Sequence, residues 1–241
     1  MDDGSPVVSH SVPATTNIDT WLVIPLFNEQ TVVGEVIAEA IQTFPNIVCV
    51  DDGSTDGSAA IAESAGARVV RHPVNLGQGA ALQTGFDYVR LDPRTRYVVT
   101  FDADGQHRVE DALAMVQRLR TEPVDVVLGS RFLDGRSKPG RLKRFVLRLA
   151  IIFGNVTTGV RLTDAHSGLR AFRRDALDKI RIQQDRMAHA SELISQIGKA
   201  KLRYVERPTK IVYTNYSRAK GQSLWNAFNI MVDLLLSRFI R

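Results

Sequence analysis

Two carboxylates and an amide follow an apolar segment in the sequence FDADGQH, at residues 101–107. Residues 97–101 are β-branched and aromatic, which predicts a buried strand. Asp102 and Asp104 stand two positions apart at its end, so their side chains can point the same way. With the amide of Gln106 they would suit a hard divalent cation that keeps open positions for phosphate oxygens. A plain turn is the alternative, but a turn alone needs neither two acids nor an amide, and we favour the metal.

The elements that must position these side chains alternate along residues 21–130. Apolar strands are predicted at 21–25, 47–51, 68–71, 97–102 and 124–129, and helices at 30–43, 56–65, 79–90 and 109–120. This alternation predicts an α/β fold with a mostly parallel, Rossmann-like sheet covered by helices on both faces. Open sheets of this kind bind ligands at the carboxyl ends of their strands.

The rhythm changes after residue 135. Residues 136–160 are basic and then apolar, and a strand at 168–172, a helix at 187–198 and an extended segment at 203–213 follow. Pro208 in the extended segment indicates an edge strand. We expect a disordered tail at 1–20, one domain at 21–221, and an amphipathic helix at 222–241.

Composition narrows the class of protein. The chain has 241 residues, is 44% hydrophobic and 24% charged, and carries a formal net charge of +5, which is ordinary for a globular protein. The single cysteine, Cys49, lies in an apolar strand and is expected to be a buried hydrophobe in a reducing compartment. Residues 131–148 hold seven basic residues and one acid. No aromatic array or nucleic-acid motif accompanies them, so a phosphorylated substrate or an anionic membrane surface is expected rather than nucleic acid.

Six segments in order carry a resemblance to a known family: PLFNE, VDDGSTDGS, NLGQGAALQTGF, DADGQH, GSRF and TDAHSGLRAF, between residues 25 and 172. Together they resemble the inverting glycosyltransferases of family 2, which have the GT-A fold. Within that family they are similar to the polyprenyl-phosphate glycosyltransferases, the group that includes dolichyl-phosphate mannose synthase. The similarity extends over about residues 21–220.

The resemblance implies a role for individual residues. It implies a nucleotide-sugar site formed by Pro25, Phe27, Glu29, Val50, Asp52, Asp102, Ala103, Asp104, Arg131 and Lys220. It implies Mg²⁺ or Mn²⁺ on Asp104 and Gln106, with Asp102, Asp104 and Arg131 carrying the reaction. An arginine expected six residues before Lys220 is Thr214, and Arg218 is a substitute. By position and charge, the candidates for the acceptor phosphate are Arg136, Lys138, Arg141 and Arg170.

The implied reaction transfers a sugar to polyprenyl phosphate for cell-envelope glycan assembly, at the cytoplasmic face of the membrane. The donor would be a UDP-sugar such as UDP-N-acetylgalactosamine, with GDP-mannose as the alternative. A sugar hydroxyl is the alternative acceptor; it needs a base, which Glu192 or Asp164 would supply. A membrane-surface adaptor without turnover is a further alternative.

Several acidic and polar residues could instead have simpler structural roles. Asp51, Asp52 and Asp56 could cap the next helix, and for Asp56 capping is preferred. His107 could orient Gln106 or the metal site, or it could lie in a solvated turn. Asp164 and Ser167 could line the acceptor cleft or cap a turn, and Glu192 is expected to be structural because a phosphate acceptor needs no base.

Attachment to the membrane is expected at two places. Residues 223–241 place apolar side chains at spacings of three and four, but a central Asp233 makes a spanning helix costly. We expect this helix at the lipid interface or against another protein, such as a small membrane protein, with residues 136–153 as a second contact. A homodimer formed through both segments is the alternative.

Overall fold

The computed structural model describes residues 17–133, 160–164, 167–184 and 188–212. The predicted basic segment at 136–160, most of the tail, and the C-terminal helix therefore lie outside the described residues. The nucleotide-sugar candidate Lys220 also lies outside them.

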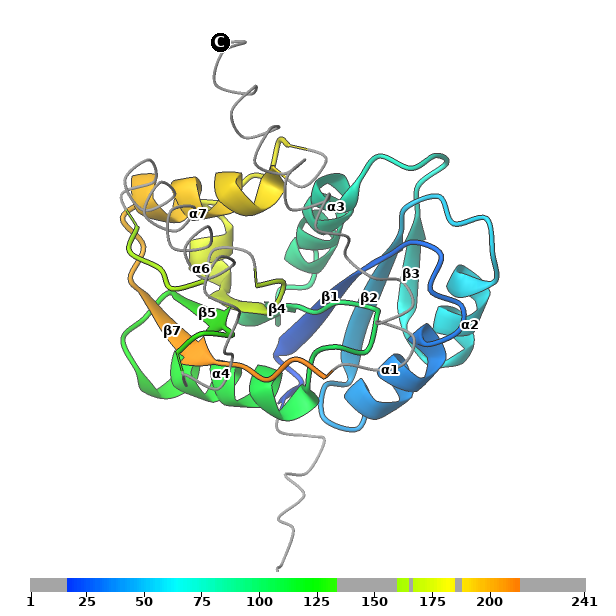
Figure 1. The fold of residues 1–241 in the computed structure, drawn as a ribbon, viewed down its shortest axis with the longest axis horizontal. Coiled ribbons are helices and arrows are strands. Elements are labelled where there is room, and N and C mark those ends of the chain that lie inside the picture. The colour runs from blue at the N-terminus through cyan, green and yellow to red at the C-terminus, as the bar shows by residue number, and fades with distance from the viewer. Residues whose placement is uncertain (1–16, 134–159, 165–166, 185–187, 213–241) are drawn as a thin grey trace, which may run out of the picture.

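The described strands form one seven-stranded sheet in the order β3-β2-β1-β4-β6-β5-β7 (Figure 1). Their bounds are Thr20–Leu26 (β1), Asn46–Asp51 (β2), Arg68–Arg71 (β3), Tyr97–Thr100 (β4), Val126–Ser130 (β5), Arg170–Arg173 (β6) and Tyr204–Pro208 (β7). Strand β6 runs antiparallel to both of its neighbours, and the other pairs are parallel. The predicted α/β fold with a mostly parallel sheet is confirmed, whereas the insertion of β6 between β4 and β5 was not anticipated.

Helices cover both faces of the sheet, as Figure 1 shows. They are Val33–Ala40 (α1), Ser58–Ser64 (α2), Gln78–Arg90 (α3), Val109–Thr121 (α4), Arg174–Leu177 (α6) and His189–Lys199 (α7). Successive side chains of β1 point to opposite faces. Leu22 and Ile24 pack in the core beneath α1 and α4, whereas Trp21 and Val23 pack in the core beneath α3 and α7. Burial on both faces explains why the central strands are almost continuously apolar.

Two close contacts show how the sequence permits this packing. A Cβ atom on Gly85 of α3 would meet Cγ1 of Val23 at 2.3 Å, so glycine is required for α3 to lie this close to β1. Cys49 of β2 is fully buried, and burial, together with the charge of Asp51, raises its pKa to about 12. The prediction that this thiol is a buried hydrophobe is confirmed.

Two elements depart most from their predicted bounds. The helix predicted at 30–43 begins only at Val33 and ends at Ala40, because residues 28–30 hydrogen-bond to a neighbouring loop instead of starting the helix. The segment predicted as extended at 203–213 forms a strand only to Pro208, and this strand is at the end of the described sheet, as its proline indicated. No helix in the described ranges is long and apolar enough to cross a membrane.

Candidate active site

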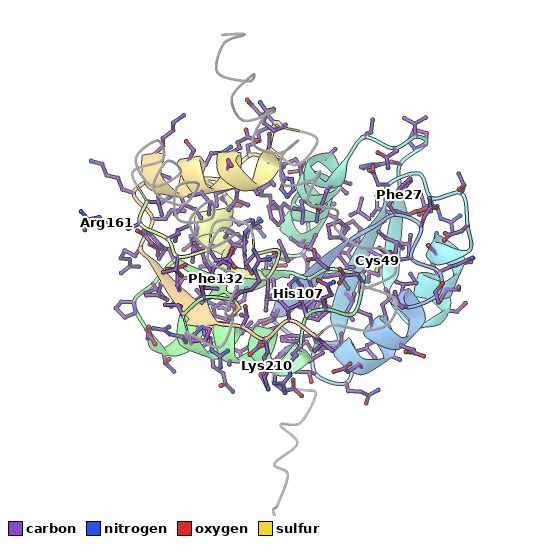
Figure 2. All side chains as sticks on the ribbon, in the orientation of Figure 1. Phe27, Cys49, His107, Phe132, Arg161 and Lys210 are labelled. Carbon is purple, nitrogen blue, oxygen red and sulfur yellow. The ribbon has the colours of Figure 1, made fainter. Side chains whose placement is uncertain are left out.

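Three loops gather at the carboxyl ends of β1, β2 and β4. Strand β1 pairs in parallel with both β2 and β4. They are residues 27–32, 52–57 and 101–108. Parallel strands end at the same edge of a sheet, so loops far apart in sequence meet there. In the view of Figure 2, His107 lies near the middle of the molecule, with Phe132 on one side and Phe27 on the other.

The loops after β1 and β2 are joined to each other by their own polar groups. Five hydrogen bonds connect them: Asn28 N to Ser54 Oγ at 3.0 Å, Thr55 N to Asn28 Oδ1 at 3.0 Å, Glu29 N to Ser58 Oγ at 2.7 Å, Gln30 N to Asp56 Oδ2 at 3.3 Å and Gly57 N to Gln30 Oε1 at 3.0 Å. These bonds satisfy backbone groups that would otherwise face water. The Phe27 ring is left 43% exposed on the outside of this joined pair of loops.

Asp52 is buried and holds a third loop in place. Its carboxylate accepts hydrogen bonds from Leu76 N at 2.9 Å and Gly77 N at 2.7 Å. It also lies 2.8 Å from Nδ1 of His72, whose Nε2 lies 2.9 Å from the Thr84 hydroxyl. The side chain therefore fixes the backbone that leads into α3, and its oxygens are already used inside the protein.

Asp102 is held by contacts on several sides. Its Oδ2 lies 2.8 Å from Nε2 of His107, and its Oδ1 accepts a long hydrogen bond of 3.5 Å from the Gln78 amide. A Cβ atom on Gly168 would lie 2.3 Å from Oδ2, so the carboxylate lies directly against a glycine. The Thr100 hydroxyl donates to the carbonyl of Gly168 at 2.6 Å and fixes that backbone. The carboxylate has little room to move.

Cations surround Asp102. Burial raises the pKa of its carboxyl group, but His107, Arg170 and His189 outweigh this effect, and the pKa lies below its ordinary value. Burial likewise lowers the pKa of His107, but Asp102 outweighs it, and the pKa of His107 is raised. Asp102 is therefore an ionised carboxylate at neutral pH. Nδ1 of His107 is buried and has no hydrogen-bond partner among the described residues.

The pKa of Asp104 is shifted in the direction opposite to that of Asp102. Burial raises the pKa of its carboxyl group, and the negative charges of Asp102 and Glu29 raise it further. Its Oδ1 accepts the backbone N–H of Gln106 at 3.0 Å, which closes a tight turn. A cation beside Asp104 would offset this accumulation of negative charge, so the donor set fits a hard divalent ion. No group of three or more His, Cys, Asp or Glu side chains in the described ranges could hold a metal, and the other ligands would have to come from phosphate and water.

Arg131, directly after β5, is clamped by Asp164. The carboxylate of Asp164 accepts hydrogen bonds from the backbone N of Arg131 at 3.1 Å, from its Nε at 2.7 Å and from its guanidinium NH2 group at 2.9 Å. Such a fork geometry fixes the plane of the guanidinium. Arg170 is buried near both Asp164 and Asp102; burial lowers its pKa to about 10, and the two carboxylates oppose that effect.

Residues 21–181 match the sequence profile described as Glycosyl transferase family 2. The chain belongs to glycosyltransferase family 2. The match covers well over half of the chain and includes every loop described above. The chain is therefore a glycosyltransferase with the GT-A fold, as its six sequence segments indicated.

The names of two relatives refer to lipid phosphates. The UDP-N-acetylglucosamine–dolichyl-phosphate N-acetylglucosaminyltransferase of Methanococcus voltae is 30% identical over 238 residues, which are 90% of this chain and 94% of the relative. The polyprenol monophosphomannose synthase of Mycolicibacterium smegmatis is 32% identical over 67% of this chain and 64% of its own length.

A solved structure agrees with the fold. Glucosyl-3-phosphoglycerate synthase from Mycobacterium tuberculosis, crystallised with Mg²⁺ and uridine diphosphate, superimposes with a TM-score of 0.64 at 20% identity. The superposition covers 86% of this chain and 75% of the other. At this identity the similarity supports the fold alone.

Several family 2 assignments made from sequence lie together in the structure. Asp102 and Glu29 lie close enough to Asp104 for their negative charges to raise the pKa of its carboxyl group. Ala103 and Gln106 lie in the same loop as Asp102 and Asp104. Arg131 directly follows β5, and its positive charge acts to lower the pKa of His107. Lys220, Arg136, Lys138 and Arg141 lie outside the described residues.

Other assigned residues are placed differently from what their roles suggested. Val50 is fully buried, with Cγ2 close to Gly85, and Asp52 is bonded inside the protein. We therefore propose that these two residues lie beneath the nucleoside site and determine its shape. Arg170 is only 3% exposed, and its charge interacts with Asp102 and Asp164 inside the protein. Its contact with an acceptor phosphate stays a prediction.

Three residues that support the site were not predicted from the sequence. Gly168 supports Asp102, His189 adds positive charge near it, and Glu206 binds the loop of Asp164. Gly168 stands in the TDAHSGLRAF segment, which could have pointed to it. The other two come from α7 and β7, which carry no distinguishing motif.

Glu192 of α7 has a structural environment. Its carboxylate accepts the backbone N–H groups of Gln183 at 3.0 Å and Gln184 at 2.8 Å, and the amide of Gln196 at 3.2 Å. These contacts agree with the preferred structural interpretation. The N-cap of α2 is Gly57, which makes no side-chain hydrogen bond, so Asp56 is not the capping residue. Asp56 lies one residue earlier and accepts the backbone N–H of Ser58 at 2.9 Å.

Proposed function

We propose that this glycosyltransferase transfers a sugar from a nucleotide-sugar, most simply a UDP-sugar, to a polyprenyl phosphate. The observation that carries the proposal is the placement of Asp102 and Asp104 at the end of β4. One carboxylate is kept ionised by surrounding cations, and the other is placed where negative charge has accumulated. The names of the relatives, which specify dolichyl phosphate and polyprenol, support the acceptor class.

The donor would bind across the carboxyl edge of the sheet. The exposed ring of Phe27 and the loop held by Asp52 would border the nucleoside, and the diphosphate would lie toward Asp104 and Gln106. A divalent cation on Asp104 and Gln106, Mg²⁺ or Mn²⁺, would neutralise the charge that develops on the departing diphosphate. Asp102, ionised and immobilised between His107 and Gly168, would keep the Asp104 loop in the right place.

The acceptor explains why no general base is required. A phosphate monoester has a second pKa of about 6 and is largely a dianion at neutral pH. Its oxygen can attack the anomeric carbon directly as the bond from that carbon to the diphosphate breaks, which inverts the configuration. Arg131, held in one plane by Asp164, would provide positive charge near the reacting groups.

A hydroxyl acceptor fits the described residues less well. It requires a side chain that can take a proton. Glu192 is occupied by backbone donors, and Asp164 is bonded three times to Arg131. Neither carboxylate is placed as a base that faces a substrate.

The test is direct transfer by the full chain. The protein is incubated with vesicles that contain polyprenyl phosphate, Mg²⁺ or Mn²⁺, and a panel of labelled UDP- and GDP-sugars. We expect label in a lipid product from which mild acid releases the sugar, because a glycosyl phosphate is acid-labile. Transfer only into an acid-stable product on a sugar hydroxyl, or no transfer from any donor, would overturn the proposal.

A further inference from the structure

The carboxylate of Glu206 in β7 binds the loop that carries Asp164. It accepts the backbone N–H of Thr163 at 2.9 Å, the Thr163 hydroxyl at 2.9 Å and the backbone N–H of Asp164 at 3.2 Å, all on Oε1. Its second oxygen lies 3.0 Å from the same Thr163 N. Thr163 and Asp164 lie outside any strand or helix, so Glu206 supplies acceptors that a ladder of strands would otherwise provide.

The same loop is bonded to the end of β5. The hydroxyls of Thr163 and Ser130 are 2.6 Å apart, and Ser130 Oγ accepts the backbone N–H of Phe132 at 3.2 Å. Asp164 then binds Arg131, the residue between Ser130 and Phe132, through its backbone N, its Nε and its NH2 group. Strand β7 therefore fixes the loop, and the loop fixes both the backbone and the guanidinium of Arg131.

We propose that Glu206 is a positioning residue for Arg131, acting through Thr163 and Asp164. This inference rests on the proposed function, in which Arg131 supplies charge to the reacting groups. If Glu206 is lost, two backbone N–H groups and a hydroxyl lose their acceptor, and the loop moves away from β7. Asp164 then no longer presents both oxygens to the guanidinium, and Arg131 turns away from the geometry that the reaction needs.

Two substitutions at Glu206 separate hydrogen bonding from charge. Glu206→Ala removes all the acceptor contacts. Glu206→Gln keeps an oxygen that can occupy the Oε1 position, and this position receives three of the four contacts. The variant should therefore retain most of the activity. Asp125→Asn is the matched control, because Asp125 pairs with Arg203 at 2.7 Å across the same two strands, at the end of β5 opposite to Arg131.

The first readout is a double-mutant cycle on kcat/KM for sugar transfer. We expect Glu206→Ala to lower kcat/KM about tenfold or more, which is the loss typical of hydrogen bonds that hold a charged group. Glu206→Gln should stay within about threefold of the wild type. In an Arg131→Ala background, Glu206→Ala should cost less than about twofold further, because its target is gone. A full, additive loss in that background would overturn the inference.

The second readout does not depend on turnover. Nε of Arg131 donates to Asp164 at 2.7 Å, so its hydrogen should exchange slowly with water, and its NMR signal can be assigned by its loss in Arg131→Lys. We expect exchange at least about tenfold faster in Glu206→Ala, and near wild-type exchange in Glu206→Gln and Asp125→Asn. Unchanged exchange in folded Glu206→Ala would overturn the inference. If Glu206→Ala does not fold, Glu206→Asp, whose carboxylate is one methylene short of the loop, is judged by the same thresholds.

The outcomes distinguish the two proposals. Absence of transfer to polyprenyl phosphate by the wild-type protein overturns the proposed function, and the exchange of the Arg131 hydrogen then decides the role of Glu206. Normal transfer by the wild type with unchanged exchange and an additive cycle overturns the role of Glu206 alone.

Discussion

The imidazole of His107 lies 2.8 Å from the carboxylate of Asp102, and the two side chains come from the same short loop after β4. His107 is nearly buried, with its ring 5.6 Å from that of Phe101 in an edge-on arrangement. The pair links the aromatic end of the strand to the carboxylate that precedes Asp104. The contact supports the prediction that His107 orients a neighbouring group rather than lying in a solvated turn, and the group in contact is Asp102, in the loop of the metal candidates Asp104 and Gln106.

Replacing this histidine tests that role. His107→Phe keeps a ring against Phe101 but removes the hydrogen bond to Asp102. We expect kcat to fall by about 10-fold to 100-fold, since hydrogen bonds to charged groups contribute about 1.5–3 kcal/mol. Steady-state kinetics and circular dichroism measure the loss and the fold. Wild-type kcat in a folded variant would contradict an orienting role.

The proposed metal requirement is tested at Asp104. Asp104→Asn should abolish transfer with the fold unchanged, because the side chain serves bound charge rather than the core. EDTA should abolish transfer reversibly, and Mg²⁺ or Mn²⁺ should restore it. Asp87→Asn, at a half-exposed carboxylate on α3, is the control and should be active. Full activity in chelator would show that no metal is needed.

Gly168 should tolerate no side chain. The methyl group of Gly168→Ala would lie 2.3 Å from Oδ2 of Asp102, so the carboxylate must move. We expect activity to fall about 100-fold and the free energy of unfolding to fall by about 1–3 kcal/mol. Gly34→Ala is the control, since its methyl would meet only the Ile61 side chain at 3.0 Å. Equal activity in the two variants would mean that the position of Asp102 is not critical.

Glu192 distinguishes the two acceptor classes. With a phosphate acceptor, Glu192→Gln should keep transfer within about threefold of the wild type, because no proton has to be removed. Stability should fall by about 1 kcal/mol, since the amide replaces one oxygen that accepts backbone N–H groups. Kinetics and thermal unfolding measure the two effects. A loss of several orders of magnitude in the folded variant would favour a hydroxyl acceptor.

Attachment to the membrane is tested by shortening the chain. A protein that ends at Gly221 should fold and bind nucleotide, but it should lose binding to liposomes and transfer to long-chain acceptors, because residues 223–241 carry the expected apolar face. Flotation with liposomes and calorimetry with UDP measure both properties. Retention of liposome binding would show that the attachment lies elsewhere.

The sequence by itself determined the layered α/β architecture and the chemistry of the loops. Long apolar strands can only be buried on both faces, and the alternation with helices then requires parallel neighbours. Asp102, Asp104 and Gln106 were recognisable because oxygen ligands at the end of a strand have few other uses. These properties depend on residues close together in the chain, where spacing and side-chain type carry the information.

Tertiary structure decided which groups support those side chains. Strand β6 inserts antiparallel between β4 and β5, and this brings Gly168 under Asp102 and buries Arg170 between two carboxylates. Strand β7 brings Glu206 to the loop of Asp164, 42 positions away in the chain. Hydrogen bonds and charge interactions act through distance in space, and no local pattern records which distant segments will meet. The sequence could therefore indicate the candidate metal-binding carboxylates, but only the packed sheet shows what holds them and Arg131 in place.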